Sequence, residues 1–312
     1  MIKIWINTDI GDDIDDAAAI ALALNSPEIE ILGISTAYKN TFKRKQMVMQ
    51  LLEQYGRTEI PVYAGYGMPL IERMDIQEEP LQYALVTAAE EEHANPADAI
   101  EAITSAFRNN PDAYFIEMAL QTNLAMAFLQ APEVMRQVQI IGMGGAFANA
   151  FPEWNIKLDP EAARIVTDYA QNLILFGLDV TKYCRIEEKQ VQMIRNSSSE
   201  QVQYLYQCMQ LFKEKTGYPY TLHDAVCITY LLDPDTARLK KGDYTVELHG
   251  DKTRGTMVDL SSYYEIETDM TEGQNSEKNK SESGKFFYHA VSIDHDKTMQ
   301  IMLQRIYGIT AE

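Results

Sequence analysis

Five aspartates lie within eight positions near the start of the chain, at Asp9, Asp12, Asp13, Asp15 and Asp16. Carboxylates this close repel one another and lower stability unless a cation gathers them. Their oxygen atoms suit a hard divalent cation such as Ca²⁺ or Mg²⁺. Acidic residues are also preferred at helix starts, but that preference explains only one or two of the five. We therefore predict a metal-binding or substrate-binding site here.

The flanking residues indicate how this cluster is positioned. Residues 2–6 (IKIWI) are mostly β-branched and aromatic, as is typical of a buried strand in a parallel sheet. Residues 17–24 (AAAIALAL) are strong helix formers. The acidic residues thus fall in a strand-to-helix loop, at the carboxyl end of the strand, where open α/β sheets bind their ligands.

Polar residues recur at the junctions between other predicted strands and helices. Two of them have a simpler explanation that is about as good: Asn40 could cap the helix that follows it, and His223 could be a structural residue bonded to a backbone carbonyl. Because such junctions share one edge of a parallel sheet, they can converge on a single site. The residues concerned are Asn40, Thr122, Asn149, Glu153, Asn155, His223 and Asp224.

Strand and helix patterns alternate along the 312 residues, with no internal repeat or linker. This alternation predicts a single α/β domain over residues 1–312, with a mostly parallel, doubly wound open sheet flanked by helices. The expected strands are residues 2–6, 28–37, 60–65, 113–118, 138–143, 173–176 and 286–293, with a hairpin at 244–248 and 256–260. The expected helices are residues 17–24, 42–54, 96–108, a helix that follows the turn at 121–123 and ends near residue 130, a helix opening at 159–160, 186–215, 225–234 and 297–307.

Three segments have no regular period. Residues 72–96 are acidic and contain two prolines, so we expect a loop with some helix, of the kind that often forms a lid. Residues 146–159 place a tryptophan among polar side chains, which indicates a binding loop. Residues 265–284 are polar and charged, which predicts a mobile insertion.

Composition narrows the possible partners and compartment. A net charge of -19 argues against a nucleic acid polymer as partner, because such binding depends on Lys and Arg. No apolar run is long enough to cross a bilayer, so no membrane role is expected. Cys184, Cys208 and Cys227 are odd in number and widely spaced, which favours reduced core thiols. We expect a soluble, unprocessed cytoplasmic protein that acts on a small molecule.

The residue types indicate a class of chemistry. Asp9, Asp16 and Asp224 would supply carboxylates to a divalent cation, and a backbone oxygen such as that of Thr122 could add another ligand. A cation acidifies a nearby water, and a carboxylate such as Asp9 can take its proton. With Asn and Glu side chains available for hydroxyl groups, the set suits hydrolysis at a sugar carbon through an oxocarbenium-like transition state. His223 could protonate a leaving group.

A rival chemistry is phosphoryl transfer. It would need a basic residue beside the acids to hold phosphate. Lys39 and Arg254 are the only candidates that the sequence suggests near them, so this hypothesis ranks last.

Residues 8–24 (TDIGDDIDDAAAIALAL) resemble the signature of the nucleoside hydrolase family, whose usual form is D-x-D-P-G-x-D-D-A. Further similar segments follow in the family's order up to about residue 260, and together they make a specific match that no single one would make. They are GISTAYKNT (33–41), IPVYAG (60–65), QTNLAMAF (121–128), IIGMGGAF (140–147), EWNIKLDPEAARIV (153–166), GLDVT (177–181), HDAVCITYLLDP (223–234) and TRGTMVD (253–259).

The resemblance implies a calcium-dependent hydrolase that cleaves the N-glycosidic bond of ribonucleosides, usually as a homodimer or homotetramer. It implies that Asp9 binds calcium and takes a proton from the attacking water, while His223 protonates the leaving base. The implied calcium ligands are Asp9, Asp16, the backbone oxygen of Thr122, and Asp224. The implied ribose contacts are Asp15, Asn40, Asn149, Glu153 and Asn155.

The chain also departs from the family pattern. Asn7 stands in place of the first Asp, Ile10 in place of Pro, and two residues are inserted before Asp15, so Asp13 could take the role given to Asp15. The loop after Met68 lacks the His-Gly element that closes over the base. These departures favour an alternative: a ribose- or metal-binding protein with little or no catalysis, or one with a non-nucleoside ribosyl substrate.

Overall fold

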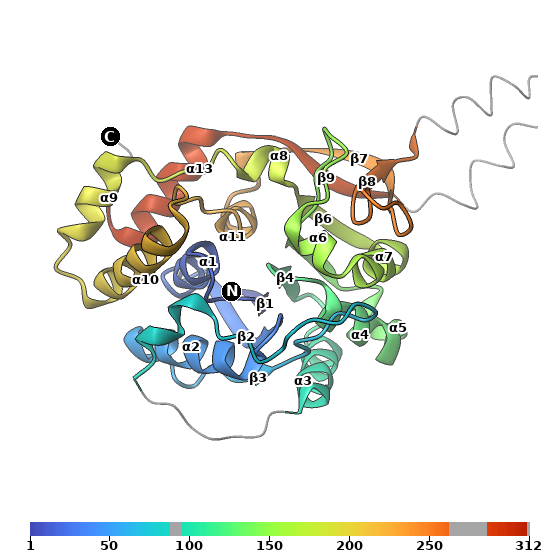
Figure 1. Cartoon of the computed structure of the whole chain (residues 1–312), viewed down its shortest axis with the longest axis horizontal. Helices are drawn as coiled ribbons and strands as arrows, with labels where there is room; N and C mark the ends of the chain where they lie inside the picture. The colour runs from blue at the N-terminus through green and yellow to red at the C-terminus, as the bar shows by residue number, and fades with distance from the viewer. Residues whose placement is uncertain (88–94, 262–285, 311–312) are drawn as a thin grey trace, which may run out of the picture.

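The computed structural model describes residues 1–87, 95–261 and 286–310. Its centre is a nine-stranded sheet with the order β3-β2-β1-β4-β5-β6-β9-β7-β8 (Figure 1). Neighbouring strands from β3 to β9 run parallel, and β7 runs antiparallel to both β9 and β8. The strands are β1 Ile2–Thr8, β2 Ile29–Thr36, β3 Val62–Ala64, β4 Tyr114–Glu117, β5 Gln139–Met143, β6 Asn172–Phe176, β7 Ala237–Val246, β8 Met257–Asp259 and β9 Phe286–Ile293.

Helices cover both faces of this sheet. The α-helices are α1 Asp15–Leu24, α2 Thr41–Gln54, α3 Pro96–Asn109, α4 Thr122–Gln130, α5 Pro132–Met135, α6 Trp154–Leu158, α7 Pro160–Tyr169, α8 Leu178–Thr181, α9 Glu188–Arg195, α10 Glu200–Thr216, α11 Ala225–Leu232 and α13 His295–Met302. Short 3₁₀ turns η1 Leu81–Leu85 and η2 Pro234–Thr236 and a π-helical turn η3 Leu303–Tyr307 complete the described elements. The predicted doubly wound, mostly parallel α/β architecture is confirmed.

Two apolar cores lie on opposite faces of the sheet. Successive side chains of β1 alternate between them: Ile4 and Ile6 belong to one core and Trp5 to the other, as the period of two in a strand requires. The first core packs α1, α2, α10, α11 and α13, whereas the second packs α3, α4 and α7, and Figure 1 shows the two groups on either side of the strands. Because the middle of β1 is covered on both faces, its residues 4–6 are all apolar.

The alanines of α1 set how closely it can pack. Nine of its ten residues are buried, and Leu24 is the exception. Small side chains allow α1 to lie close to α11, with which it makes direct contacts. This close packing brings the start of α1 next to the start of α11, where the acidic residues meet.

Several predicted boundaries were wrong. Residues 146–159 contain the helix α6, because the Glu153 side chain caps its first backbone N–H groups. Residues 186–215 form two helices, since the chain breaks at Asn196 and restarts with Ser199 as the cap of α10. Strand β7 begins at Ala237, earlier than predicted, because its charged side chains are on the solvent side while its backbone pairs with β9. The insertion predicted at 265–284 lies outside the described residues.

Candidate active site

Three buried carboxylates form the centre of the candidate site. Asp15 and Asp16 occupy the first turn of α1, and Asp224 is the residue before α11. One oxygen from each of these side chains lies within 4.8 Å of the others, and the residues are 8%, 5% and 3% exposed. Residues far apart in the sequence therefore converge where two packed helices begin at the same edge of the sheet.

The electrostatics of this cluster indicate that it needs a cation. Burial, followed by repulsion from neighbouring carboxylates, raises the pKa of Asp15, Asp16 and Asp224 well above the usual range. Burial likewise raises the pKa of Asp9 to about 7, although the charge of Arg44 opposes the shift. Oxygen-only donors with this much negative charge fit a hard divalent cation, which would replace the protons that the carboxylates otherwise retain.

The other two aspartates of the loop have structural partners. Asp12 pairs with Arg44, at 2.6 Å between Oδ2 and Nη2, and its second oxygen accepts a bond from the Leu81 backbone N–H at 3.2 Å. Asp13 accepts hydrogen bonds from the backbone N–H groups of Ile14 and Asp15, so it holds the turn that leads into α1. The loop thus assigns its five acids to different tasks, which spacing alone did not separate.

Sequence reasoning missed Arg44. The prediction that Lys39 and Arg254 are the only cations near the acids was wrong, because Lys39 pairs with Glu78 and Arg254 with Glu161, whereas Arg44 reaches the loop itself. The sequence does contain a signal for the burial of Arg44. Arg44 precedes Met47 by three residues and Val48 by four, so it lies on the apolar stripe of α2. A basic residue in such a stripe needs buried acceptors.

Asn40 and Thr122 begin the helices after β2 and β4. The Asn40 side chain caps α2 by accepting a bond from the Lys43 backbone N–H at 3.1 Å, which confirms the simpler explanation for its place. Thr122 is fully buried, and its hydroxyl donates to Asp159 Oδ2 at 2.6 Å. Both residues lie at the edge of the sheet that carries the acidic loop.

The segment after β5 presents Glu153 and Asn155. The Glu153 carboxylate accepts bonds from the backbone N–H groups of Gly145 at 2.9 Å and Asn155 at 3.0 Å. The Asn155 side-chain amide donates to the carbonyls of Met118 and Met143, each at 3.2 Å, and so ties the ends of β4 and β5 together. Asn149 differs, because it lies exposed on the loop.

His223 precedes Asp224 and faces α8. Its Nδ1 lies 2.8 Å from the hydroxyl oxygen of Thr181, a side chain that is fully buried. Burial lowers the pKa of His223, and the charge of Asp13 partly offsets this effect. The imidazole is therefore neutral near pH 7, next to the carboxylates but not bonded to them.

A polar network lies beneath the acidic loop. Asn7, which stands where the family signature has Asp, donates to Glu117 Oε1 at 2.6 Å and accepts bonds from Ser35 and Asn123 at 2.7 and 2.8 Å. Glu117 is fully buried, and its Oε2 has no hydrogen-bond partner among the described residues. An acidic side chain from β4 thus stands beside the position where the acid of β1 is missing, a juxtaposition that sequence reasoning did not foresee.

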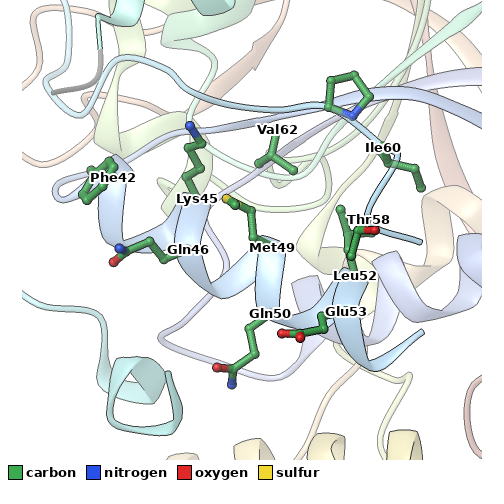
Figure 2. Close-up of a pocket in the computed structure, with 11 residues that line it drawn as sticks. Phe42, Lys45, Gln46, Met49, Gln50, Leu52, Glu53, Thr58, Ile60 and Val62 are labelled. Atoms are coloured by element: carbon green, nitrogen blue, oxygen red, sulfur yellow. The ribbon is translucent and has the colours of Figure 1, made fainter. Parts of the chain in front are cut away.

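A cavity of about 430 Å³ lies elsewhere, between α2 and the start of β3 (Figure 2). Figure 2 shows Phe42, Met49 and Val62 among its lining side chains. None of the residues that line it is a predicted site residue, so it is separate from the acidic cluster. The candidate site is defined by its carboxylates and not by this cavity.

Comparison with known proteins identifies the family. The model of the inosine-uridine preferring nucleoside hydrolase family matches residues 4–300. A pyrimidine-specific ribonucleoside hydrolase RihA from Citrobacter koseri is 31% identical over 266 residues, covering 78% of this chain and 85% of the relative. A probable uridine nucleosidase 1 from Oryza sativa subsp. japonica is 29% identical over 276 residues, covering 82% and 85%. A solved plant nucleoside hydrolase has the same fold, with a TM-score of 0.80, 24% identity and 99% of each chain covered.

The structure combines a mostly parallel α/β fold with a cluster of buried carboxylates of the kind that can hold a metal ion. The chain belongs to the inosine-uridine preferring nucleoside hydrolase family, and by class it is an N-glycosidase. Among the described residues, no helix has the length and apolar character that a membrane span requires. The three cysteines are free and buried, as predicted.

Proposed function

We propose that the protein hydrolyses the N-glycosidic bond of ribonucleosides to free base and ribose, with Ca²⁺ as its cofactor. The observation that carries the proposal is the convergence of Asp15, Asp16 and Asp224 in a chain of this family. Such a buried acidic centre is costly without a cation, and the ribose hydroxyls of a nucleoside offer further oxygen ligands.

The proposed cation ligands are Asp9, Asp16, Asp224 and the backbone oxygen of Thr122. When bound, calcium supplies positive charge that makes a nearby water more acidic. Asp9 then takes a proton from that water, a role that suits a buried carboxylate able to change its protonation state near neutral pH. The water oxygen adds to the anomeric carbon of the ribose as the bond to the base nitrogen breaks.

The remaining residues orient the substrate. Asp15, Asn40, Glu153 and Asn155 are the proposed partners of the ribose hydroxyls, together with Asn149, which would have to move from its exposed position. Asp15 lies close enough to Asp16 and Asp224 to face cation and hydroxyls together. Asp13 accepts a bond from the Asp15 backbone N–H, so it is better suited to hold this turn than to replace Asp15.

We propose that His223 supplies the proton of the leaving base. If the Thr181 hydroxyl donates a hydrogen bond to Nδ1, the ring proton lies on Nε2, which is then free to point at the substrate. Because the ring is neutral when free, it can donate a hydrogen bond that strengthens as charge develops on the leaving nitrogen. Transfer of a whole proton requires the imidazolium form, so we propose that the ring takes up a second proton once the substrate is bound. The Nε2 proton then moves to the base nitrogen as the bond to the anomeric carbon breaks, and His223 returns to its neutral form.

One observation favours the alternative of a ribose- or metal-binding protein with little catalysis, or one with a non-nucleoside ribosyl substrate. Asn40 and Glu153 are both engaged in capping helices, and Asn149 is exposed, so the sugar-contacting set is only partly assembled. We further propose a cytoplasmic homodimer or homotetramer, in keeping with the family resemblance.

The test is release of free ribose from a panel of purine and pyrimidine ribonucleosides, with and without a calcium chelator. Asp9→Asn keeps the shape of the side chain but removes the base, so we expect at least a roughly 100-fold loss of kcat. Asp251→Asn, at an exposed site, is the matched control. Turnover that is insensitive to the chelator and to Asp9→Asn would overturn the mechanism, and calcium binding without turnover on any nucleoside would support the alternative.

A further inference from the structure

We infer that Arg44 is a positioning residue that fixes the backbone on which both Asp9 and Asn40 are placed. The inference rests on the proposed function, since it concerns the same site. Arg44 belongs to α2, yet its guanidinium crosses to the acidic loop after β1 and is only 1% exposed.

The contacts of Arg44 are directed at two loops. On the loop after β1, Nη1 donates to the carbonyls of Asp9 and Ile10, the latter at 2.7 Å, and Nη2 donates to Asp12 at 2.6 Å. On the junction after β2, Nε donates to the Tyr38 carbonyl at 2.8 Å. A planar guanidinium presents these donors in a fixed fork, which a lysine cannot reproduce.

The junction that Arg44 holds has a strained conformation. Tyr38 and Lys39 have φ values of 70° and 52°, in the left-handed region that residues other than glycine seldom adopt. These two residues lead directly into Asn40. The bond to the Tyr38 carbonyl, and the guanidinium 5.1 Å from the centre of the Tyr38 ring, support this conformation. Arg44 therefore sets where the chain turns before Asn40.

The loop after β1 is held by further contacts. Asp12 bridges Arg44 to the backbone of Leu81 at the start of η1. The carbonyl of Gly11 also accepts a bond from the Gln82 backbone N–H at 2.8 Å. The loop is thus held from α2 and from η1, and within residues 1–87, 95–261 and 286–310 the side-chain bond to the Asp9 carbonyl comes from Arg44.

Two physical roles make opposite predictions for calcium binding. If Arg44 acted only as a nearby positive charge, its removal would tighten calcium binding, because like charges repel. If it positions Asp9, its removal should weaken calcium binding and lower kcat more than it changes KM. A misplacement of about 1 Å at a catalytic group can cost on the order of 100-fold in rate.

The experiment compares Arg44→Ala, Arg44→Lys and the wild type. Arg164→Lys, on the surface pair with Asp168, is the matched control. Calcium affinity is measured by calorimetry, kcat and KM are measured on the best nucleoside substrate, and guanidinium is added at about millimolar, non-denaturing concentrations. We expect weaker calcium binding in both variants, a kcat roughly 100-fold lower in Arg44→Ala, and partial rescue of that variant by guanidinium but not by ammonium.

Wild-type affinity and kcat in both variants would overturn the inference, and so would tighter calcium binding with unchanged kcat. If Arg44→Ala does not fold, Arg44→Lys decides: it retains the charge and differs in geometry, so full activity and affinity in this variant would also overturn the inference. If the wild type cleaves no nucleoside, the proposed function fails, whereas the calcium affinities still test the position of Asp9 independently.

Discussion

At the scale of single residues, the aspartates of the acidic loop differ in the groups that they contact. Asp12 forms an ion pair with Arg44, and Asp13 accepts bonds from backbone N–H groups, whereas Asp15, Asp16 and Asp224 face one another. Buried carboxylates that lack a cation retain protons, since ionisation in a poorly solvated site is costly. The protonation of the site and binding of the proposed calcium ion should therefore be linked.

The first prediction concerns this linkage. Because the pKa of Asp9 is raised to about 7 and those of Asp15, Asp16 and Asp224 are raised as well, calcium binding near neutral pH should release protons. Affinity should therefore rise with pH up to about 8. Calorimetry in buffers of different ionisation enthalpy counts the protons released. A binding enthalpy that is the same in every buffer would contradict the prediction.

The same shifts set the stability of the metal-free protein. A carboxyl whose pKa is raised in the folded state contributes stability that is complete below its unfolded pKa and is lost as pH rises through the folded value. For Asp9 this window runs from about pH 4 to about pH 7. The chelated protein should thus become less stable across that window, and calcium should restore the loss.

Glu117 gives a second prediction. Burial raises its pKa well above the usual range, although its bond from Asn7 opposes the shift. Its contribution to stability is therefore present at low pH and is lost as pH rises. Glu117→Gln removes this titration. Above about pH 5, the free energy of unfolding of the variant minus that of the wild type should therefore increase by up to about 1.4 kcal/mol per pH unit.

Urea unfolding at several pH values measures this difference for Glu117→Gln. The exposed Glu133→Gln is the control and should show no such trend. A constant difference between the Glu117→Gln variant and the wild type at all pH values would show that Glu117 is ionised in the folded protein.

At the scale of elements, a glycine in β2 makes room for a large side chain of the neighbouring strand β1. Gly33 of β2 lies beside the Trp5 ring of β1, and the indole N–H of Trp5 donates to Ser35 at 3.1 Å. Ser35 in turn donates to Asn7, so packing at this point is continuous with the polar network under the acidic loop. The position of β1, and of the loop after it, depends on this fit.

The third prediction is that Gly33→Ala destabilises the protein by about 1–3 kcal/mol. An added Cβ would lie 2.5 Å from Trp5 Cζ3, inside contact distance, so the ring must shift. Chemical denaturation gives the change in unfolding free energy. Trp5→Phe leaves more room, so the double variant should recover part of the loss. Strictly additive effects of the two substitutions would argue against this contact as the cause.

At the scale of the whole molecule, the large net negative charge affects stability. The chain has a net charge of -19, yet its described core residues fill two layers, one on each face of the sheet. Self-repulsion of that size lowers the stability of the compact state, and salt screens it. The acidic cluster adds a local repulsion that a divalent cation relieves more strongly than screening does.

The fourth prediction follows from this balance. Raising the NaCl concentration from about 0.02 to about 0.3 M should raise the Tm of the chelated protein by a few degrees, because the Debye length falls below about 10 Å. Millimolar calcium should raise the Tm further at constant ionic strength, because binding to the folded state adds stability. Scanning calorimetry measures both. Equal effects of calcium and magnesium at equal concentration would contradict a calcium preference.

The sequence determined the architecture and the composition of the site. Alternating strand and helix patterns predicted the doubly wound sheet, because the periods of two and 3.6 residues survive in any tertiary context. The five aspartates predicted a cation site, since that density of charge is unfavourable without one. The order of short motifs then indicated the family, which the family model confirmed.

Only the tertiary structure decided which acid does what. Asp12 and Asp13 are equivalent to their neighbours in type and spacing, and their separate partners depend on Arg44 and on the turn that starts α1. Glu117 and Asn7 meet because β1 and β4 are adjacent in the sheet although 110 positions separate the two residues in the chain. Partners of this kind come from packing between distant segments, so no local pattern encodes them.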